Sequence, residues 1–301
     1  MSHVISASRR TDVPAFYADW FIKRLRSGYV FVQHPFTRKL LRVSLKQDDI
    51  STIVFWSKNY SPLLSKLSEI EKITQNLFFH YTITATKELE LNTPDYKDSI
   101  QDYIFLAKRY SPGRIIWRFD PICVTDKISF AMHEARFIQC IDLLKGHAQK
   151  CFISFVHPYK KILNNLQKYT NHTLYEPSME KKCEFALRLA AHAEKRGLQL
   201  FACCNDYLLS EKIMKARCID GQYLSGIFNS SIDTRPASTR KQCACTKSID
   251  IGAYTTCAHG CIYCYANIDK NAASDTYSIH NPDWNALHMH VDETTTYPTH
   301  V

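Results

Sequence analysis

Three cysteines near the end of the chain have a spacing that suits iron–sulfur chemistry. Cys257, Cys261 and Cys264 form a C-x3-C-x2-C pattern, and Tyr263 precedes the third of them. Each thiolate can bind a different iron of a cubane cluster, so three thiolates leave one iron without a protein ligand. That iron could bind a small molecule and pass it an electron. Gly260 allows the close turn that wrapping a cluster requires.

Zinc is the main alternative for these cysteines, because thiolates bind zinc as well. A zinc site needs four ligands, and His259 or a distant cysteine could complete the set. Zinc sites commonly pair one C-x2-C unit with another, however, and the sequence contains no second C-x2-C unit. The spacing therefore favours iron–sulfur over zinc, with free or disulfide-bonded cysteines as a third interpretation.

A second group of cysteines could form another metal site. Cys243 and Cys245 make a C-x-C pair, a frequent chelating arrangement. Cys203 and Cys204 end a predicted strand, and adjacent strand residues face opposite ways, so one of the two should point inward. The candidate ligands of a second iron–sulfur cluster are Cys204, Cys218, Cys243 and Cys245. Buried thiols with one reactive pair are the alternative.

Apolar, β-branched and aromatic runs predict the strands that must position these cysteines. Most of the runs are nearly continuous, which suits parallel strands covered on both faces. The predicted strands are 3–8, 29–34, 52–57, 77–82, 114–119, 151–156, 198–203 and 248–254. The predicted helices are 14–26, 61–72, 96–110, 130–144 and 179–196, with Gly113 and Gly197 as expected helix stops. This alternation predicts an α/β fold, a parallel (β/α) barrel of the TIM type.

The chain is long enough for one such domain. Its 301 residues are 45% hydrophobic, which allows a sizeable core. We expect a single barrel domain over residues 1–272, with the cluster loop at 243–267, followed by a polar tail over 273–301. No run approaches the roughly 20 apolar residues that span a bilayer, and the N-terminus lacks a secretory pattern. We therefore expect a soluble cytoplasmic protein whose 12 cysteines serve metal or redox chemistry.

Polar residues follow the predicted strands, where a parallel barrel has its active-site mouth. Arg9, Arg10 and Asp12 follow the first strand, and Arg118 and Asp120 end the fifth. Guanidinium groups pair with carboxylates, and carboxylates accept hydrogen bonds from hydroxyl and amino groups. These five residues are the candidate catalytic residues, and salt bridges between strand ends are the alternative interpretation.

The charge of the chain indicates a second function class. A formal net charge of +9 could favour an anionic partner such as nucleic acid. The basic residues are spread along the chain, however, as expected for solvated helix faces. A non-catalytic iron–sulfur or zinc protein that binds nucleic acid is therefore the alternative function.

The cysteine loop resembles the cluster-binding motif of the radical S-adenosylmethionine (SAM) superfamily. The resemblance implies that Cys257, Cys261 and Cys264 hold a [4Fe-4S] cluster whose free iron binds the amino and carboxylate groups of SAM. One electron, from a reductase such as flavodoxin or ferredoxin, would then release a 5′-deoxyadenosyl radical that acts on an unknown substrate. The Tyr-Cys-Tyr-Ala continuation also resembles the spore photoproduct lyase branch, which would make the substrate nucleic acid.

The same resemblance implies roles for residues beside the cluster. Tyr263 would take the aromatic position beside the adenine of SAM. Arg10, or its neighbour Arg9, could bind the SAM carboxylate, and Asp12 or Asp120 could accept hydrogen bonds from its ribose or amino group.

The position of the motif departs from the superfamily pattern. There it follows the first barrel strand, whereas here it begins at residue 257 of 301. The resemblance therefore implies a circularly permuted barrel, in which the usual first strand, 248–254, comes last. Chain ends lie close together in a closed barrel, so permutation is sterically reasonable.

The whole chain also resembles an uncharacterised bacterial family, a domain of unknown function with radical-SAM-like cysteines at its C-terminus. The segments that carry this resemblance are 5–12, 53–59, 116–122, 218–221 and 248–267. They span nearly the full length, but they imply no substrate.

Overall fold

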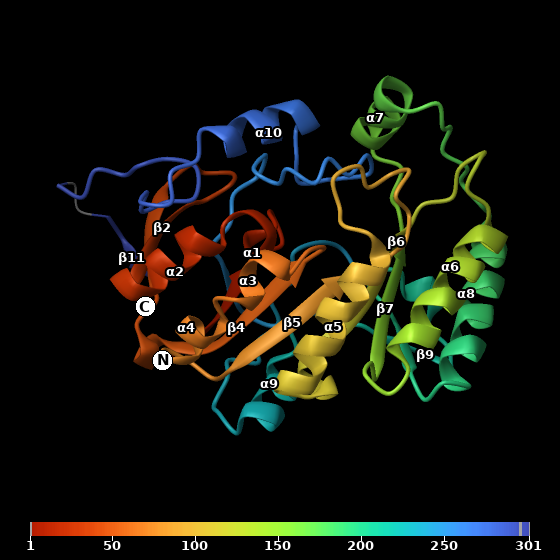
Figure 1. Ribbon diagram of the computed structural model, residues 1–301, viewed down its shortest axis with the longest axis horizontal. Helices are drawn as coiled ribbons and strands as arrows, with labels where there is room; N and C mark the ends of the chain where they lie inside the picture. The colour runs from red at the N-terminus through yellow and green to blue at the C-terminus, as the bar shows by residue number, and fades with distance from the viewer. Residues whose placement is uncertain (1, 295–296, 301) are drawn as a thin grey trace.

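Eight parallel strands form the main sheet of the computed structural model, which describes residues 2–294 and 297–300 (Figure 1). They are β1 (His3–Ala7), β4 (Ile50–Ser57), β5 (Leu77–Thr82), β6 (Ile115–Ile122), β7 (Lys150–Phe155), β8 (Gln199–Ala202), β9 (Ile213–Lys215) and β10 (Ile249–Asp250). Their order across the sheet is β10-β1-β4-β5-β6-β7-β8-β9. The fold is α/β, as predicted, with the strands in an open or barrel-like (β/α) arrangement.

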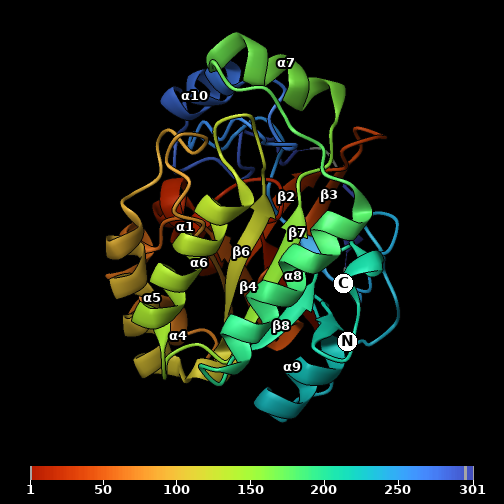
Figure 2. The ribbon, with the colours of Figure 1, turned by 90° about the vertical axis from the view of Figure 1, so that its right-hand side faces the viewer.

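Helices alternate with these strands (Figure 2). The α-helices are α1 (Val13–Phe16), α2 (Ala18–Ser27), α3 (Ser61–Leu64), α4 (Leu67–Glu71), α5 (Tyr96–Tyr110), α6 (Phe130–Leu144), α7 (Lys160–Tyr169), α8 (Met179–Glu194), α9 (Gly221–Phe228) and α10 (Lys270–Ser278). Short 3-10 helices are η1 (Gln47–Asp49), η2 (Pro112–Arg114) and η3 (Asp206–Leu208). None of the described helices is long and apolar enough to cross a membrane.

The two faces of the sheet bury separate groups of side chains. Ile5 and Phe79 pack into the large core under the outer helices, whereas their neighbours Val4 and Phe78 face the other side. There they meet Leu224 of α9, in a smaller core that also contains several cysteines. Successive strand residues point to opposite faces, so burial of both faces explains the nearly continuous apolar runs.

The strand that precedes the cysteine loop lies beside the first strand of the chain. β10 pairs in parallel with β1, with Ile5 opposite Ile249 and Ser6 opposite Asp250. This placement confirms that the last strand neighbours the first, although β10 is shorter than the predicted 248–254. In the described part of the chain, β10 and β9 are the two edges of the sheet.

The predicted strand at 29–34 does not belong to the main sheet, so its expected place in the barrel was wrong. β2 (Tyr29–Gln33) pairs antiparallel with β3 (Leu40–Ser44), which pairs in parallel with β11 (Thr299–His300). The connection between β2 and β3 is too short for the crossover that a parallel pair requires, so the two strands can pair only antiparallel. The main sheet gains β9 instead, a strand too short to leave an apolar run in the sequence.

The segment 273–301, predicted as a polar tail, packs against the N-terminal part of the chain where it is described. The indole Nε1 of Trp20 donates to the carbonyl oxygen of Trp284 at 2.9 Å. The backbone N–H of Phe31 donates to the carbonyl oxygen of Asn285 at 2.8 Å. These contacts attach the segment to α2 and β2, although its composition gave no sign of a packing face.

Candidate functional site

The cysteine loop is fixed to the loop that follows β5, at the carboxyl ends of the strands. The backbone N–H of Asn92 donates to the carbonyl of His259, and that of Ile262 donates to the carbonyl of Leu89, both at 2.9 Å. In both views α7 and α10 lie beyond the same end of the sheet (Figures 1 and 2). The loop therefore occupies the mouth at which parallel (β/α) folds place their active sites.

The loop is also closed on itself. The side-chain amide of Asn267 donates to the carbonyl of Cys257 at 2.8 Å, and the N–H of Cys264 donates to the carbonyl of Cys261 at 3.1 Å. Gly260 has a φ of 66°, a left-handed conformation that glycine adopts without strain. These features bring the three cysteines of the motif into one compact turn.

The three thiols lie within electrostatic reach of one another. Burial of the sulfur is the main cause that raises the pKa of Cys257 and of Cys261, and the nearby Cys264 raises both further. Lys58 opposes this for Cys261 by lowering its pKa. Ionising Cys257 and Cys261 therefore requires a cationic partner, which a metal cluster would supply.

Two observations count against a zinc ion in this loop. His259 is 2% exposed, and its ring nitrogens face the carboxylate of Asp12 at 2.7 Å and the carbonyl of Asn92 at 3.4 Å, so neither is free to bind a metal. Among the described residues, no three His, Cys, Asp or Glu side chains converge to hold a single ion. A cubane cluster does not need such convergence, because each thiolate binds a separate iron.

Asp12, a predicted catalytic and SAM-binding residue, is buried at the junction of β1, β4 and the cysteine loop. Its carboxylate accepts four hydrogen bonds, from Ala15 N at 3.0 Å, Ser57 Oγ at 2.7 Å, Lys58 N at 2.8 Å and His259 Nε2 at 2.7 Å. The first of these caps helix α1. Asp12 is therefore placed to position the cysteine loop.

Tyr263, the predicted adenine neighbour, is 7% exposed and its hydroxyl is held by a buried ion pair. The hydroxyl donates to the carboxylate of Glu90, and Lys58 Nζ lies 3.1 Å from the hydroxyl and 2.9 Å from Glu90 Oε1. Burial alone would lower the pKa of Lys58, but Glu90 and Cys261 raise it above its usual value. A charged pair thus lies beside Cys261. Glu90 was missed because it stands in a loop after β5 and follows no strand end directly.

The two arginines predicted after β1 differ in their contacts. Arg10 is held by Asp250, with Nε 3.6 Å from Oδ1, and its Nη1 donates to the carbonyl of Gly252 at 3.2 Å. Arg9 Nη2 donates to Ser248 Oγ at 2.8 Å, but its Nε and Nη1 are buried with no partner in the described part of the chain. The Nε and Nη1 groups of Arg9 are therefore available to donate hydrogen bonds to an anion.

Arg118 and Asp120, predicted at the same mouth, pair with each other and adjoin the second cysteine group. Arg118 Nη2 bonds to Asp120 Oδ2, and its Nη1 donates to Cys218 Sγ at 3.1 Å. The structure brings the predicted Cys204, Cys218, Cys243 and Cys245 together through thiol–thiol contacts. It adds Cys203, whose Sγ lies 3.5 Å from Cys218 Sγ.

Tyr265 lies between the two cysteine groups. It directly follows Cys264, and its hydroxyl donates to the carbonyl of Arg9 at 2.9 Å. Tyr265 is 55% exposed, and Arg240 and Arg9 lie within electrostatic reach of its hydroxyl. Arg240 in turn donates to Cys203 Sγ at 3.7 Å. Both cysteine groups therefore adjoin the same positively charged mouth.

Comparison with known proteins identifies a family but no activity. The model of a family described as a domain of unknown function, DUF1848, matches residues 4–266. The matched segment contains both cysteine groups. No curated protein and no solved structure matches the chain.

Proposed function

The chain belongs to the DUF1848 family, and we propose that it is a radical SAM enzyme with a [4Fe-4S] cluster bound by Cys257, Cys261 and Cys264. One observation carries the proposal. The loop with these three cysteines follows a strand that pairs in parallel with β1, and it is fixed at the carboxyl ends of the sheet. Three thiols, without a free histidine, are the donor set that leaves one iron open.

The cluster would supply a single kind of chemistry. With one iron free of protein ligands, it can bind SAM and deliver the electron that cleaves the sulfonium bond. A small electron-transfer protein such as flavodoxin or ferredoxin would provide that electron. Side chains of this protein would bind SAM, position the cysteine loop and contact the substrate.

We assign the carboxylate of SAM to Arg9. Two of its guanidinium nitrogens are buried without a partner among the described residues, and guanidinium groups pair with carboxylates in a fork. Arg10 is less suited, because Asp250 already neutralises it. Asp12 and Tyr263 position the loop, since their polar atoms are bonded within the protein.

The substrate would meet the mouth beside Arg118 and Asp120. Both residues lie within β6 and pair with each other, and Arg118 donates to Cys218 of the second cysteine group. Their pairing keeps the charges balanced until a polar substrate competes for them. The reaction that follows radical formation is left open by this arrangement.

The test is a search for the cleavage product of SAM. The protein is reconstituted anaerobically with iron and sulfide, reduced with dithionite, and assayed for 5′-deoxyadenosine by chromatography. Wild-type protein should form it, and Cys261→Ala should not. Cys140→Ala, a buried cysteine of α6 outside both groups, is the matched control and should keep the activity.

Two results would contradict the proposal. One is 5′-deoxyadenosine formation by the Cys261→Ala variant. The other is a reconstituted, reduced wild-type protein that never cleaves SAM but is retained by nucleic acid in a salt-sensitive manner. The latter result would favour the non-catalytic alternative, for which the +9 net charge is the motivating observation.

A further inference from the structure

We propose that Cys203, Cys204, Cys218, Cys243 and Cys245, here called the five-thiol group, bind a second iron–sulfur cluster. The group shares no residue with the loop that carries Cys257, so the inference is independent of the function proposed above. It depends on four features: the contacts between the thiols, the donors aimed at their sulfur atoms, their place at the edges of the sheet, and a route of access.

The interactions between the thiols form a closed ring. Cys203 Sγ lies 3.5 Å from Cys218 Sγ, and electrostatic interactions link Cys203 with Cys204, Cys204 with Cys243, Cys243 with Cys245, and Cys245 with Cys218. Three separate segments of the chain contribute to the ring. Isolated buried cysteines behave as small hydrophobic residues and do not need one another as neighbours. Four of these five thiols would suffice for a cubane cluster, which takes one thiolate per iron.

The backbone at Cys204 makes this ring possible. We expected only one of Cys203 and Cys204 to face inward, because strand residues alternate. β8 ends at Ala202, however, and Cys204 has a φ of 53°, in the left-handed region that non-glycine residues seldom adopt. The turn brings the second sulfur to the same side as the first. Such strained positions are often found at functional sites.

Four of the five sulfur atoms face a hydrogen-bond donor from the protein. The pairs are Arg118 Nη1 with Cys218 at 3.1 Å, Arg240 Nη2 with Cys203 at 3.7 Å, Ile219 N with Cys245 at 3.5 Å, and Thr239 Oγ1 with Cys243 at 3.6 Å. A neutral thiol is only a weak acceptor. Donors aimed at sulfur suit thiolates that bind a metal, and they tune the cluster in iron–sulfur proteins.

Positive charge accumulates on this face of the sheet. The guanidinium groups of Arg9 and Arg118 both lie 5.5 Å from the centre of the Trp56 ring. Several thiolates around a cluster make an anionic unit, which Arg118 and Arg240 would balance, since each donates to a sulfur of the group.

The five-thiol group connects the two edges of the main sheet. Cys203 and Cys204 follow β8, Cys218 follows β9, and Cys243 and Cys245 precede β10. β9 and β10 are the edge strands of the described sheet, so a cluster here would join those edges without strand pairing. Metal binding of this kind contributes directly to folding.

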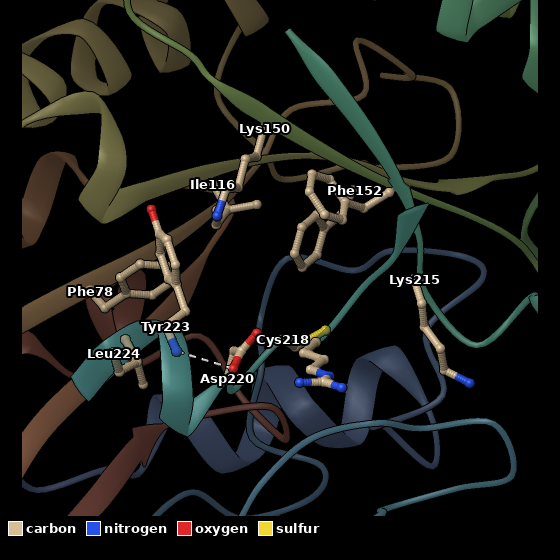
Figure 3. Close-up of a pocket in the computed structure, with 11 residues that line it drawn as sticks. Phe78, Ile116, Lys150, Phe152, Lys215, Cys218, Asp220, Tyr223 and Leu224 are labelled. Atoms are coloured by element: carbon tan, nitrogen blue, oxygen red, sulfur yellow. Dashed lines mark hydrogen bonds between the residues drawn. The ribbon is translucent and has the colours of Figure 1, made fainter. Parts of the chain in front are cut away.

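A small pocket gives access to the group. It has a volume of about 40 Å³, Cys218 is in its wall, and Lys150, Lys215 and Arg217 are among its other residues. Figure 3 shows the Cys218 sulfur beside Asp220, with Lys150 and Lys215 on other walls of the pocket. A proposed metal site needs such a route, and the basic residues would attract anionic sulfide.

The experiment counts iron and acid-labile sulfide per chain after anaerobic reconstitution. Wild-type protein should contain about eight irons, four for each cluster. The triple variant Cys204→Ala, Cys243→Ala, Cys245→Ala should retain about four irons, because two thiols cannot hold a cubane. The matched control, Cys140→Ala, Cys151→Ala, Cys183→Ala, removes three cysteines that pack in the large core away from both groups and should keep the wild-type count.

A complementary variant separates this inference from the proposed function. Removal of Cys257, Cys261 and Cys264 leaves the five-thiol group intact, and the protein should keep about four irons and the electron paramagnetic resonance signal of one reduced cluster. The iron count and the resonance signal of this variant are measured with all five thiols of the five-thiol group in place. They therefore test the second cluster even if the first triple variant fails to fold. If the first cluster does not exist, this variant and the wild type should contain the same four irons.

Three results would overturn the inference. The first is a folded Cys204, Cys243, Cys245 variant, judged by circular dichroism, with the wild-type iron content. The second is zinc in place of iron, lost in that same variant. The third is a pair of disulfides in reconstituted protein, Cys203 with Cys218 and Cys243 with Cys245, found by mass spectrometry of unreduced peptides, since they leave only one free thiol in the group.

Discussion

The carboxylate of Asp12 lies 2.7 Å from the imidazole Nε2 of His259, and the contact joins residues 247 positions apart in the sequence. Their side chains are 6% and 2% exposed. Asp12 follows the first strand of the chain, and His259 stands inside the cysteine loop. The contact therefore orients the loop on the sheet, and the hydrogen bonds from Ser57 and Lys58 hold the carboxylate in place.

We predict that Asp12→Ala lowers the free energy of unfolding by about 3–5 kcal/mol, because it leaves buried donors of Ser57, Lys58 and His259 without an acceptor. Urea denaturation at constant pH measures this. Asp95→Ala is the matched control, since Asp95 also caps a helix but is exposed and contacts only the start of α5. It should cost about 1 kcal/mol.

Equal losses in the two aspartate variants would show that Asp12 is only a helix cap. The iron content gives a second readout. If Asp12 positions the loop, Asp12→Asn, which can still cap α1, should bind less iron than the wild type after the same reconstitution. An unchanged iron content in Asp12→Asn would contradict the positioning role.

Gly252 lets two segments approach closely just before the cysteine loop. A Cβ atom at this position would lie 2.6 Å from Ser8 Cβ and 3.1 Å from Thr11 Cγ2. Gly252→Ala should therefore force the segments apart and lower the free energy of unfolding by about 1–3 kcal/mol. Chemical denaturation measures the loss.

Gly226→Ala provides the comparison for Gly252→Ala. Gly226 lies inside α9, and an added Cβ there meets no heavy atom within 4 Å. Alanine favours helices over glycine, so this variant should be stabilised by up to about 1 kcal/mol. A Gly252→Ala protein as stable as the wild type would mean that the β1 and β10 segments are not tightly packed.

Much of the main sheet could be predicted because burial on both faces leaves continuous apolar runs. The predicted strand 77–82 coincides with β5, and the predicted helices 96–110 and 130–144 coincide with α5 and α6. The predicted helices 14–26 and 61–72 are each split in two. α5 ends at Ser111, with a φ of 90°, rather than at Gly113, which shows that a glycine nearby is not enough to place a helix end.

The site could be predicted in its residues but not in their pairings. Strand ends of a parallel sheet share one edge, so Arg10 and Asp12 are expected at the mouth, and in the structure Asp12 contacts the cysteine loop through His259. Their partners come from distant segments, as when Asp250 neutralises Arg10. Local sequence patterns do not predict contacts between residues so far apart in the chain. The same holds for Glu90, which pairs with Lys58 across the site.

The buried His133 should make stability depend on pH. The pKa of His133 is lowered to about 4, chiefly by burial and also by Arg136, while a hydrogen bond to the carbonyl of Cys123 opposes the shift. In the unfolded chain a histidine binds a proton near pH 6.5. The unfolded state thus binds more protons between about pH 6.5 and 4, so stability should fall as the pH drops through this window, by roughly 3 kcal/mol in total.

Denaturation at a series of pH values measures this dependence. His133→Leu should flatten the curve between about pH 6.5 and 4, even if it lowers stability at neutral pH by leaving the Cys123 carbonyl unpaired. Met132→Leu, an exposed change on the same helix, removes no titrating group and should keep the wild-type slope. A wild-type slope in His133→Leu would assign the dependence to other groups.

Arg9 and Arg10 should respond in opposite ways to the same substitution. If Arg9 binds the SAM carboxylate as proposed, Arg9→Gln should weaken SAM binding to the reconstituted protein about 10- to 100-fold, the loss expected for a hydrogen bond to a charged group. Arg10→Gln should change SAM affinity far less and lower the free energy of unfolding instead, because it leaves Asp250 with an unbalanced charge. Equilibrium binding of SAM and urea denaturation of both variants give the two readouts. An affinity loss confined to Arg10→Gln would reassign the carboxylate to Arg10, and unchanged affinity in both would remove this pair from SAM binding.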